Sequence, residues 1–471
     1  RQMCIRDRNT KVNIRSVKYM LKGMSVAATT LGCKVNQAET DSMLDMLKAA
    51  GANIVEFDEK ADIYIVNTCS VTNIADKKSR QMLHRARKMN PDGIVIAAGC
   101  YVQSAREILE QDEAIDIVIS NNKKKSITEI VNDYINVRNN GKNAPGKDHE
   151  AMEYFVDISR ETEYEEMGGH VPVGHTRAYV KIQDGCNQFC SYCIIPYVRG
   201  RIRSRSQEAI LAEVSELAEA GIKEVVLTGI HISSYGKDKN NEGALIELIE
   251  AISKIKGIKR IRLGSLEPGI ITEEFVERIS SNSKVCPHFH LSLQSGCDSV
   301  LKRMNRKYTC KQYFEKCDML RKAYKSPALT TDVIVGFPGE TEEEFAETVR
   351  YLTELNLYEM HIFKYSPRKG TVAAAMKEQV APEIKNERSD VLLKLAHDNK
   401  TAYEAQFEGC ELEVLVEEVV KKNNKTYLRG HTERYMDILI DVGDISMPES
   451  FVNSFVYVTY TQNGGNLPLL L

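Results

Sequence analysis

The segment CNQFCSYC carries the residues whose types and spacing are best suited to chemistry. Its cysteines, Cys186, Cys190 and Cys193, are separated by three residues and then by two. Zinc sites and ferredoxin-type clusters usually pair cysteines two residues apart and need four ligands, but no fourth cysteine or histidine lies nearby in the sequence. Three thiolates on a four-iron cluster leave one iron without a protein ligand. This iron can bind an exogenous ligand, as catalysis requires. The spacing therefore favours a catalytic iron–sulfur cluster over the alternative, a structural zinc site completed by a distant residue.

Three further cysteines stand at matching places earlier in the chain. Cys33, Cys69 and Cys100 end the segments SVAATTLGC, DIYIVNTC and IVIAAGC, each of which reads as a short strand. Ligands of open parallel sheets bind at the carboxyl ends of the strands. One cysteine in such a place is usually a small buried hydrophobic residue. Three in matching places predict a second three-cysteine iron–sulfur cluster.

The elements that must position these cysteines follow an alternating pattern. Apolar β-branched runs alternate with helical patterns, which is typical of a parallel sheet covered by helices. The strands predicted for the first part are residues 25–31, 61–68, 93–99 and 114–120. Six more are predicted later, at residues 177–185, 223–230, 259–266, 288–295, 329–337 and 359–366. Six such units favour an open, partial (β/α)6 barrel. A helix near 381–406 and a tail rich in short strands predict a small all-β barrel at the end.

This pattern divides the chain into segments with expected boundaries. The predicted segments are a non-native or disordered lead at 1–23, an α/β cluster domain at 24–137, a polar linker at 138–176, the partial barrel at 177–400, the all-β domain at 401–462 and a tail at 463–471. No apolar run reaches the length of a membrane span, and no signal peptide opens the sequence. We therefore expect a cytoplasmic protein with no membrane partner, in which closely spaced cysteines favour metal or redox chemistry over disulfides.

Two basic segments stand out against a net charge of −3. RGRIRSR places Arg199, Arg201, Arg203 and Arg205 at alternate positions, so an extended backbone would point all four one way, toward phosphate. The competing interpretation is a structural clamp bonded to barrel carboxylates. The second segment is a predicted helix after Cys69, and its candidate RNA contacts are Lys77, Lys78, Arg80 and Arg85. A solvated helix face is the alternative there. His288 and His290 alternate along a strand, and with no carboxylate partner evident we interpret them as ordinary strand histidines.

The cysteine loop on such a barrel resembles the radical S-adenosylmethionine (SAM) superfamily. The segments LGCKVNQAET, NTCSVTNIADKKSRQ, GCNQFCSYCIIPYVRGRIRSR and SLEP resemble the methylthiotransferases of that superfamily, in particular the branch that modifies threonylcarbamoyladenosine in tRNA. The resemblance implies an N-terminal methylthiotransferase domain, a radical SAM barrel and a C-terminal TRAM domain. It further implies two 4Fe-4S clusters, SAM as cosubstrate and an electron donor such as flavodoxin or ferredoxin.

The implied reaction adds a methylthio group to C2 of the modified adenosine (A37) beside the anticodon, in the tRNA anticodon loop. One SAM methylates a sulfide at the cluster of Cys33, Cys69 and Cys100, and a second, at the cluster of Cys186, Cys190 and Cys193, yields a 5′-deoxyadenosyl radical that abstracts hydrogen from C2. The alternatives are methylthiolation of isopentenyladenosine in tRNA or of a ribosomal protein aspartate, and a non-catalytic iron–sulfur RNA-binding protein.

Five residues at strand ends are expected to contact SAM in the manner of the superfamily. They are Tyr192, Gly229, Glu267, Gln294 and Gly336. The alternative for the two glycines is a tight turn between strand and helix. Glu267 precedes Pro268, so its alternative role is to cap the next helix.

Overall fold

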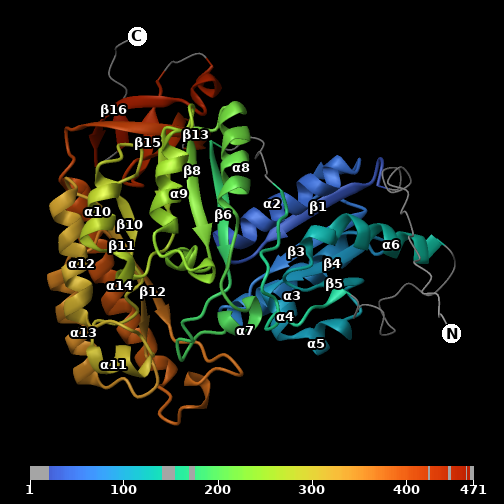
Figure 1. Cartoon of the computed structure of the whole chain (residues 1–471), viewed down its shortest axis with the longest axis horizontal. Coiled ribbons are helices and arrows are strands. Elements are labelled where there is room, and N and C mark those ends of the chain that lie inside the picture. The colour runs from blue at the N-terminus through green and yellow to red at the C-terminus, as the bar shows by residue number, and fades with distance from the viewer. Residues whose placement is uncertain are drawn as a thin grey trace, which may run out of the picture. The chain divides into compact units, whose positions relative to one another are not determined.

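A computed structural model describes residues 21–139, 154–168, 176–422, 425–443, 447–462 and 464–466 (Figure 1). These residues form two compact units, the first drawn from 21–32, 39–70, 74–139 and 154–157 and the second from 33–38, 71–73 and the described residues beyond 157. Most of the predicted lead and of the predicted tail lies outside the described residues. The segment boundaries predicted above stay predictions. Among the described residues, no helix has the length and apolar character needed to cross a membrane.

The first unit is built on a five-stranded parallel sheet. Its strands are β1 (Ser25–Thr30), β2 (Asn53–Val55), β3 (Ile63–Thr68), β4 (Ile94–Gly99) and β5 (Ile117–Ile119), in the order β2-β1-β3-β4-β5. The central strands β3 and β4 are buried along their whole length, as continuous Val/Ile/Ala-rich runs require in a covered parallel sheet. The four predicted strands are confirmed. The three-residue edge strand β2 was not predicted.

Among the described residues, five helices accompany this sheet. They are α2 (Lys34–Ala49), α3 (Asn73–Met89), α4 (Cys100–Ser104), α5 (Arg106–Glu110) and α6 (Ile127–Asn139). Helix α3 buries Ser79, Leu83 and Ala86, which recur at helical spacing, so its opposite face is left to the charged residues. Leu83 and Ala86 pack with Val66 and Val95 of the sheet in one hydrophobic core.

The second unit contains the six predicted parallel strands. They are β6 (Arg177–Asp184), β8 (Glu224–Gly229), β9 (Arg260–Leu263), β10 (His288–His290), β11 (Ala328–Val335) and β12 (Glu359–Lys364). β6, β8 and β9 pair in one sheet and β10, β11 and β12 in another, and a parallel bridge between Leu266 and Leu291 links the two. The expected radical SAM half-barrel is confirmed. A two-residue strand, β7 (Arg203–Ser204), pairs antiparallel to β6 and was not predicted.

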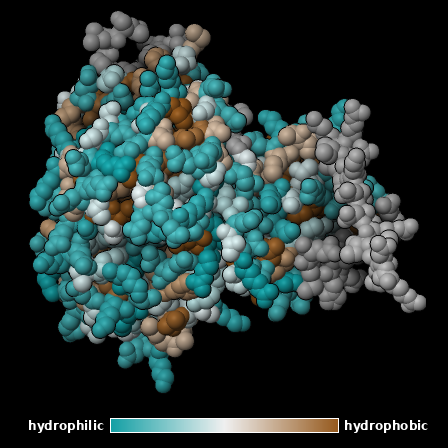
Figure 2. Space-filling view, in the orientation of Figure 1, coloured by the Kyte–Doolittle hydropathy of each residue, from teal (hydrophilic) through white to brown (hydrophobic). Residues whose placement is uncertain are grey.

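Helices between and directly after these strands accompany the half-barrel. They are α7 (Ile195–Arg199), α8 (Gln207–Glu219), α9 (Ala244–Ser253), α10 (Glu273–Ser280), α11 (Asp298–Arg303), α12 (Cys310–Ala323), α13 (Glu342–Leu355) and α14 (Pro382–Ala405). Thr309 and Thr341 start α12 and α13 as capping boxes, which satisfy backbone donors at those helix ends. On the face shown in Figure 2, hydrophilic residues cover most of the surface and hydrophobic ones are scattered.

The C-terminal part of this unit is a closed five-stranded barrel, which confirms the all-β prediction. Its strands are β13 (Glu411–Lys422), β14 (Lys425–Thr432), β15 (Asp437–Asp441), β16 (Phe455–Thr461) and β17 (Gly464–Asn466), in the order β13-β14-β15-β17-β16. Alternate residues of β16 are buried, as expected for strands that enclose a core. The three-residue strand β17 was not predicted.

A buried ionic layer joins the half-barrel to this small barrel. Nε of Arg262 on β9 donates to Oε1 of Glu224 on β8 at 2.8 Å, and Nη1 of Arg262 donates to the carbonyl of Glu433 at 2.9 Å. Arg177 on β6 pairs with Glu417 on β13. Burial alone would raise the pKa of Glu224, but the Arg262 guanidinium, helped by Arg177, lowers it to about 2.

Candidate active site

The loop between β6 and α7 holds the three-cysteine motif. Cys186 follows β6 by two residues, and its backbone N–H donates to the carbonyl of Gly200 at 3.0 Å. The backbone N–H of Cys193 donates to the carbonyl of Cys190, also at 3.0 Å. Gly185 has φ +72°, and a Cβ there would lie 1.8 Å from the carbonyl oxygen of Arg201. Only glycine therefore allows the loop to turn back on itself before the first cysteine.

All three cysteines line a cavity of about 310 Å³ at the carboxyl ends of the barrel strands. Three of the residues predicted to contact SAM line the same cavity: Tyr192, Glu267 and Gln294. Gln294 has φ +78°, which is uncommon for a residue with a side chain. The structure thus brings half of the predicted metal ligands together with most of the predicted SAM contacts.

Gly229 and Gly336 are not among the residues that line this cavity. A Cβ on Gly229 would lie 3.0 Å from the carbonyl oxygen of Gln183, so close packing of two strands already accounts for the small residue. Gly336 has φ +67°, and a Cβ there would lie 2.3 Å from Cγ of Lys385. The turn interpretation therefore explains Gly336, and contact of either glycine with SAM stays a prediction.

Arg306 is a cavity residue that the sequence did not indicate. Its Nη1 lies 3.1 Å from Sγ of Cys190, and its Nη2 donates to Oε1 of Glu267 at 2.6 Å. Its Nε donates to the hydroxyl of Tyr308 at 2.8 Å. Burial would lower the pKa of Arg306, but Tyr192, Tyr308 and Glu267 raise it well above its usual value. A fixed positive charge therefore stands beside one cysteine sulfur and orients the carboxylate of Glu267.

Two cysteines of the motif, Cys186 and Cys193, lie in surroundings that disfavour the ionised thiolate form of their side chains. Burial raises the pKa of Cys186 to about 11 and that of Cys193 to about 12. His231 also lines the cavity, and burial lowers its pKa, so its imidazole is neutral at pH 7. Soft thiolate ligands suit iron–sulfur clusters, and metal binding displaces the thiol protons. Three thiols that line one cavity, with Arg306 to balance thiolate charge, fit a cluster held by three cysteines.

Two cysteines of the other triad follow neighbouring strands of the first unit. Thr68 of β3 and Gly99 of β4 are registered partners, and Cys69 and Cys100 come directly after them. Adjacent strands lie about 4.8 Å apart, so the two cysteines start from neighbouring backbone positions. Both are buried. Cys33 is exposed and follows the end of β1 by three residues. That all three share one cluster stays a prediction.

The expectation that four arginines point one way toward phosphate is wrong for Arg199, Arg203 and Arg205. Arg199 ends a helix rather than lying on a strand, and all three side chains are buried. Arg199 and Arg203 lie 3.2 and 3.7 Å from the carboxylate of Asp184. Arg205 pairs with Glu213 and, at 2.6 Å, with Glu166. The clamp interpretation is therefore correct for these three, because buried charges need partners.

Arg201 and the candidate RNA-binding cations of α3 are exposed. The guanidinium of Arg201 lies 4.5 Å from the ring centroid of Phe189 in the cysteine loop. On α3, the predicted contacts Lys77, Lys78, Arg80 and Arg85 are all exposed. Nη1 of Arg80 donates to the hydroxyl of Tyr101 at 2.8 Å, and Arg85 pairs with Asp58 at 2.8 Å. Contact of these residues with RNA stays a prediction.

Known proteins resemble this chain over most of its length. Residues 180–352 match the Radical SAM superfamily, and residues 25–120 match "Uncharacterized protein family UPF0004". The threonylcarbamoyladenosine tRNA methylthiotransferase MtaB of Bacillus subtilis (strain 168) is 39% identical over 88% of this chain and 90% of its own length. The MtaB of Aquifex aeolicus (strain VF5) is 37% identical over 88% of this chain and 98% of its own.

A relative from another branch and a solved structure are also similar to this chain. The tRNA-2-methylthio-N(6)-dimethylallyladenosine synthase of Thermoanaerobacter pseudethanolicus is 35% identical over 92% of this chain and 90% of its own. Among solved structures, the radical S-adenosylmethionine methyltransferase TsrM from Kitasatospora setae, with cobalamin and a [4Fe-4S] cluster bound, superposes with a TM-score of 0.53 at 14% identity. That match covers 73% of this chain and 77% of TsrM, and it supports the fold alone.

Proposed function

Because this chain belongs to the family of radical S-adenosylmethionine tRNA methylthiotransferases, we propose that it adds a methylthio group to C2 of threonylcarbamoyladenosine in tRNA, beside the anticodon. The observation that carries the proposal is one cavity lined by Cys186, Cys190 and Cys193, in a chain so similar to two MtaB enzymes. The tRNA-2-methylthio-N(6)-dimethylallyladenosine synthases compared are 35–37% identical, against 39% and 37% for these two, so identity favours threonylcarbamoyladenosine only through the 39% match. The segment LGCKVNQAET also favours threonylcarbamoyladenosine.

The three cysteines of the loop would hold a 4Fe-4S cluster with one open iron, and SAM would lie in the same cavity. When bound, such a cluster supplies the electron that cleaves SAM, a reaction beyond the reach of protein side chains. Glu267 and Gln294 line this cavity and would receive polar groups of SAM, and the ring of Tyr192 would pack against its adenine. Arg306 holds the carboxylate of Glu267 in one orientation through a 2.6 Å hydrogen bond. Neutral His231 offers the cavity a hydrogen-bonding group without adding charge.

Cys33, Cys69 and Cys100 would hold the second cluster, at which sulfur would be methylated. The support is that two of them follow registered residues of adjacent strands and the third follows the next strand of the same sheet. The single-stranded anticodon loop lets a base reach the cavity without duplex opening. The exposed cations of α3 and Arg201 would meet its phosphates. A low-potential protein such as flavodoxin or ferredoxin would supply the electrons.

A side-by-side assay tests the substrate. The reduced, cluster-reconstituted enzyme is incubated with SAM and with one tRNA prepared in three forms, carrying threonylcarbamoyladenosine, isopentenyladenosine or unmodified adenosine at position 37. We expect methylthiolation of the first form only, detected by mass spectrometry of the nucleosides. Efficient methylthiolation of the isopentenyladenosine form would assign the chain to the other branch of the family.

A further inference from the structure

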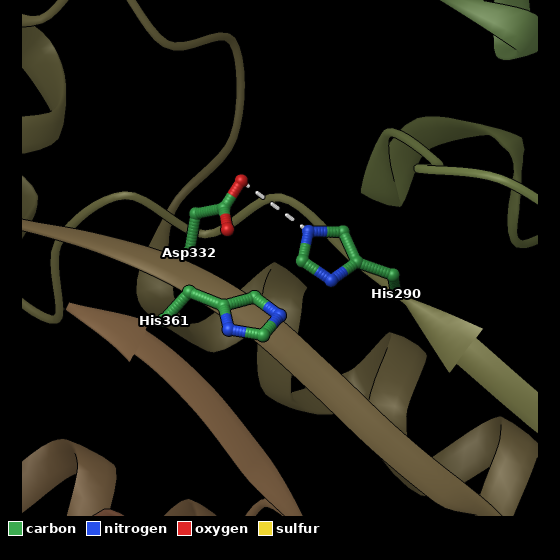
Figure 3. Close-up of side chains that lie close together, drawn as sticks. All are labelled: His290, Asp332 and His361. Atoms are coloured by element: carbon green, nitrogen blue, oxygen red, sulfur yellow. Dashed lines mark ion pairs between the residues drawn. The ribbon is translucent and has the colours of Figure 1, made fainter. Parts of the chain in front are cut away.

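A second group of potential ligands lies in the half-barrel, outside the cysteine loop. His290 on β10, Asp332 on β11 and His361 on β12 come from three adjacent strands, and Figure 3 shows their side chains gathered in one place. One ligand atom of each lies within 4.8 Å of the others. The interpretation of His290 as a histidine without a carboxylate partner is wrong, because its Nε2 lies 3.3 Å from Oδ2 of Asp332.

The strand register explains this arrangement. Asp332 and His361 are registered partners of β11 and β12, so their side chains lie next to each other on one face. His290 is registered with Thr330, which precedes Asp332 by two residues and therefore shares its face. The sequence separates these residues widely and gives no motif that joins them. Only the parallel pairing of three strands brings two imidazoles and a carboxylate together.

The chemistry of this set matches a divalent transition ion. Two imidazoles and one carboxylate suit Zn²⁺, Fe²⁺ and Co²⁺. The distance of 3.3 Å between His290 Nε2 and Asp332 Oδ2 is close to the roughly 3.4 Å between two ligands about 2.1 Å from one tetrahedral ion. Nδ1 of His290 shares a hydrogen bond of 3.0 Å with the Thr330 hydroxyl, the kind of outer contact that fixes the ring of a metal-binding histidine.

The group is also accessible. His361 is exposed, His290 and Asp332 are partly exposed, and Asp332 lines the cavity described above. The rings of His290 and His361 stack with centroids 5.7 Å apart and an interplanar angle of 23°. By contrast, His288, two residues before His290, is buried. An ion can therefore reach the three ligand atoms without unfolding the strands.

We propose that His290, Asp332 and His361 bind a divalent first-row transition ion, at a site separate from both cysteine triads. Three protein ligands leave at least one position of a four-coordinate ion for water or for an oxygen atom of a molecule in the cavity. The site does not depend on the tRNA substrate proposed above, and it is tested without measuring activity.

The test measures metal binding to the full-length, untagged, cluster-reconstituted protein. The protein is dialysed against Co²⁺, and bound cobalt and iron are measured together by mass spectrometry. We expect the wild type to bind one cobalt per chain that His361→Ala lacks, with at least a tenfold loss of affinity in the variant. Asp332→Asn should show a similar loss, because it removes the anionic ligand and keeps the side-chain shape. Iron content should stay the same in all of these proteins.

His397→Ala is the matched control, because His397 is an exposed histidine on α14 that does not belong to this group. It should bind cobalt like the wild type. Equal cobalt binding by the wild type and His361→Ala, with iron content intact, would overturn the proposal. That result would leave His290 and Asp332 as an ordinary hydrogen-bonded pair.

Discussion

Single residues set the charge and the geometry of the candidate active site. Its thiols are buried or partly buried, and the buried guanidinium of Arg306 lies 3.1 Å from Sγ of Cys190. The same guanidinium holds Glu267 and the Tyr308 hydroxyl. Arg306 is therefore a positioning residue, because its hydrogen bonds fix both a proposed cluster ligand and a proposed SAM contact.

Replacing Arg306 with Gln should weaken SAM binding more than it lowers iron content. Loss of the charged hydrogen bond to Glu267 costs about 1.5–3 kcal/mol, which predicts a rise of at least tenfold in the KM for SAM. The measurement is 5′-deoxyadenosine formation by reconstituted enzyme at several SAM concentrations, with iron quantified in the same sample. Arg303→Gln is the control, because Arg303 pairs with Glu344 at 2.6 Å outside the cavity. An unchanged KM in Arg306→Gln would contradict the assigned role.

The two cysteine triads should be separable by mutation. Replacing Cys186, Cys190 and Cys193 with Ala should leave roughly half of the iron and abolish SAM cleavage, because the open iron is lost. Replacing the earlier triad, Cys33, Cys69 and Cys100, should spare SAM cleavage and stop methylthiolation. Iron analysis and 5′-deoxyadenosine formation check both outcomes. Full iron content in the first triple variant would refute the two-cluster proposal.

At the scale of elements, two basic segments of similar composition have different surroundings. The arginines of RGRIRSR pack against Asp184 and Glu213, except for Arg201. Helix α3 instead buries an apolar face and leaves Lys77 and Lys78 exposed. Whether a cationic side chain stabilises the fold or is available to bind phosphate therefore depends on the element in which it lies.

The double variant Lys77→Gln/Lys78→Gln should weaken tRNA binding and flatten its dependence on salt. The slope of log K against log salt is negative. For each lysine that no longer neutralises a phosphate, this slope becomes less negative by about 0.7–0.9, because fewer counterions are released. Titration of labelled tRNA at several salt concentrations measures that slope.

Lys254→Gln/Lys256→Gln provides the matched control, since both lysines are exposed in the loop that precedes β9, at the opposite end of the barrel strands. This control should leave the slope unchanged. Arg203→Gln should reduce the stability of the fold, because the charge of Arg203 is buried beside Asp184. The salt dependence of tRNA binding by the protein that remains folded should be unaltered. Equal salt slopes for the α3 variant and the wild type would show that these lysines of α3 do not contact RNA phosphates.

The sequence was sufficient for the elements that have extended apolar patterns, and insufficient for interactions made only in the fold. The ten strands predicted for the sheet and the half-barrel are present, whereas β2, β7 and β17 have two or three residues and no extended apolar run. The spacing of Cys186, Cys190 and Cys193 was sufficient to predict a site at their loop, and all three line the cavity. Arg306 and His361 were missed because their partners are distant in sequence. The three buried arginines were misjudged because charge alone does not reveal burial.

At the scale of the whole second unit, a buried ionic layer holds the half-barrel against the C-terminal barrel. The carboxylate of Glu224 has a pKa of about 2 in the folded protein, against an ordinary value of 4.5. A lowered pKa stabilises the fold fully above pH 4.5, and this contribution is lost as the pH falls from 4.5 toward 2. The shift corresponds to about 3 kcal/mol.

Glu224→Gln should therefore lower the free energy of unfolding by about 3 kcal/mol at pH 7, because Arg262 and Arg260 lose the buried carboxylate with which both form ion pairs. The difference from wild type should shrink to less than half at about pH 3. Urea unfolding followed by circular dichroism at both pH values measures it. Glu250→Gln is the control, because Glu250 forms a partly exposed pair with Arg278 and its replacement should cost no more than about 1 kcal/mol. A pH-independent difference would contradict the ionic account.

The most direct test of the central claim is the tRNA nucleoside content of a strain that lacks this protein. Nucleosides from the deletion strain and from the complemented strain are compared by mass spectrometry. We expect 2-methylthio-threonylcarbamoyladenosine to disappear, threonylcarbamoyladenosine to accumulate, and complementation to restore the methylthio form. Complementation with the Cys186→Ala protein should not restore it, because the catalytic cluster cannot form. Unchanged 2-methylthio-threonylcarbamoyladenosine, with loss of the methylthio form of isopentenyladenosine instead, would contradict the account.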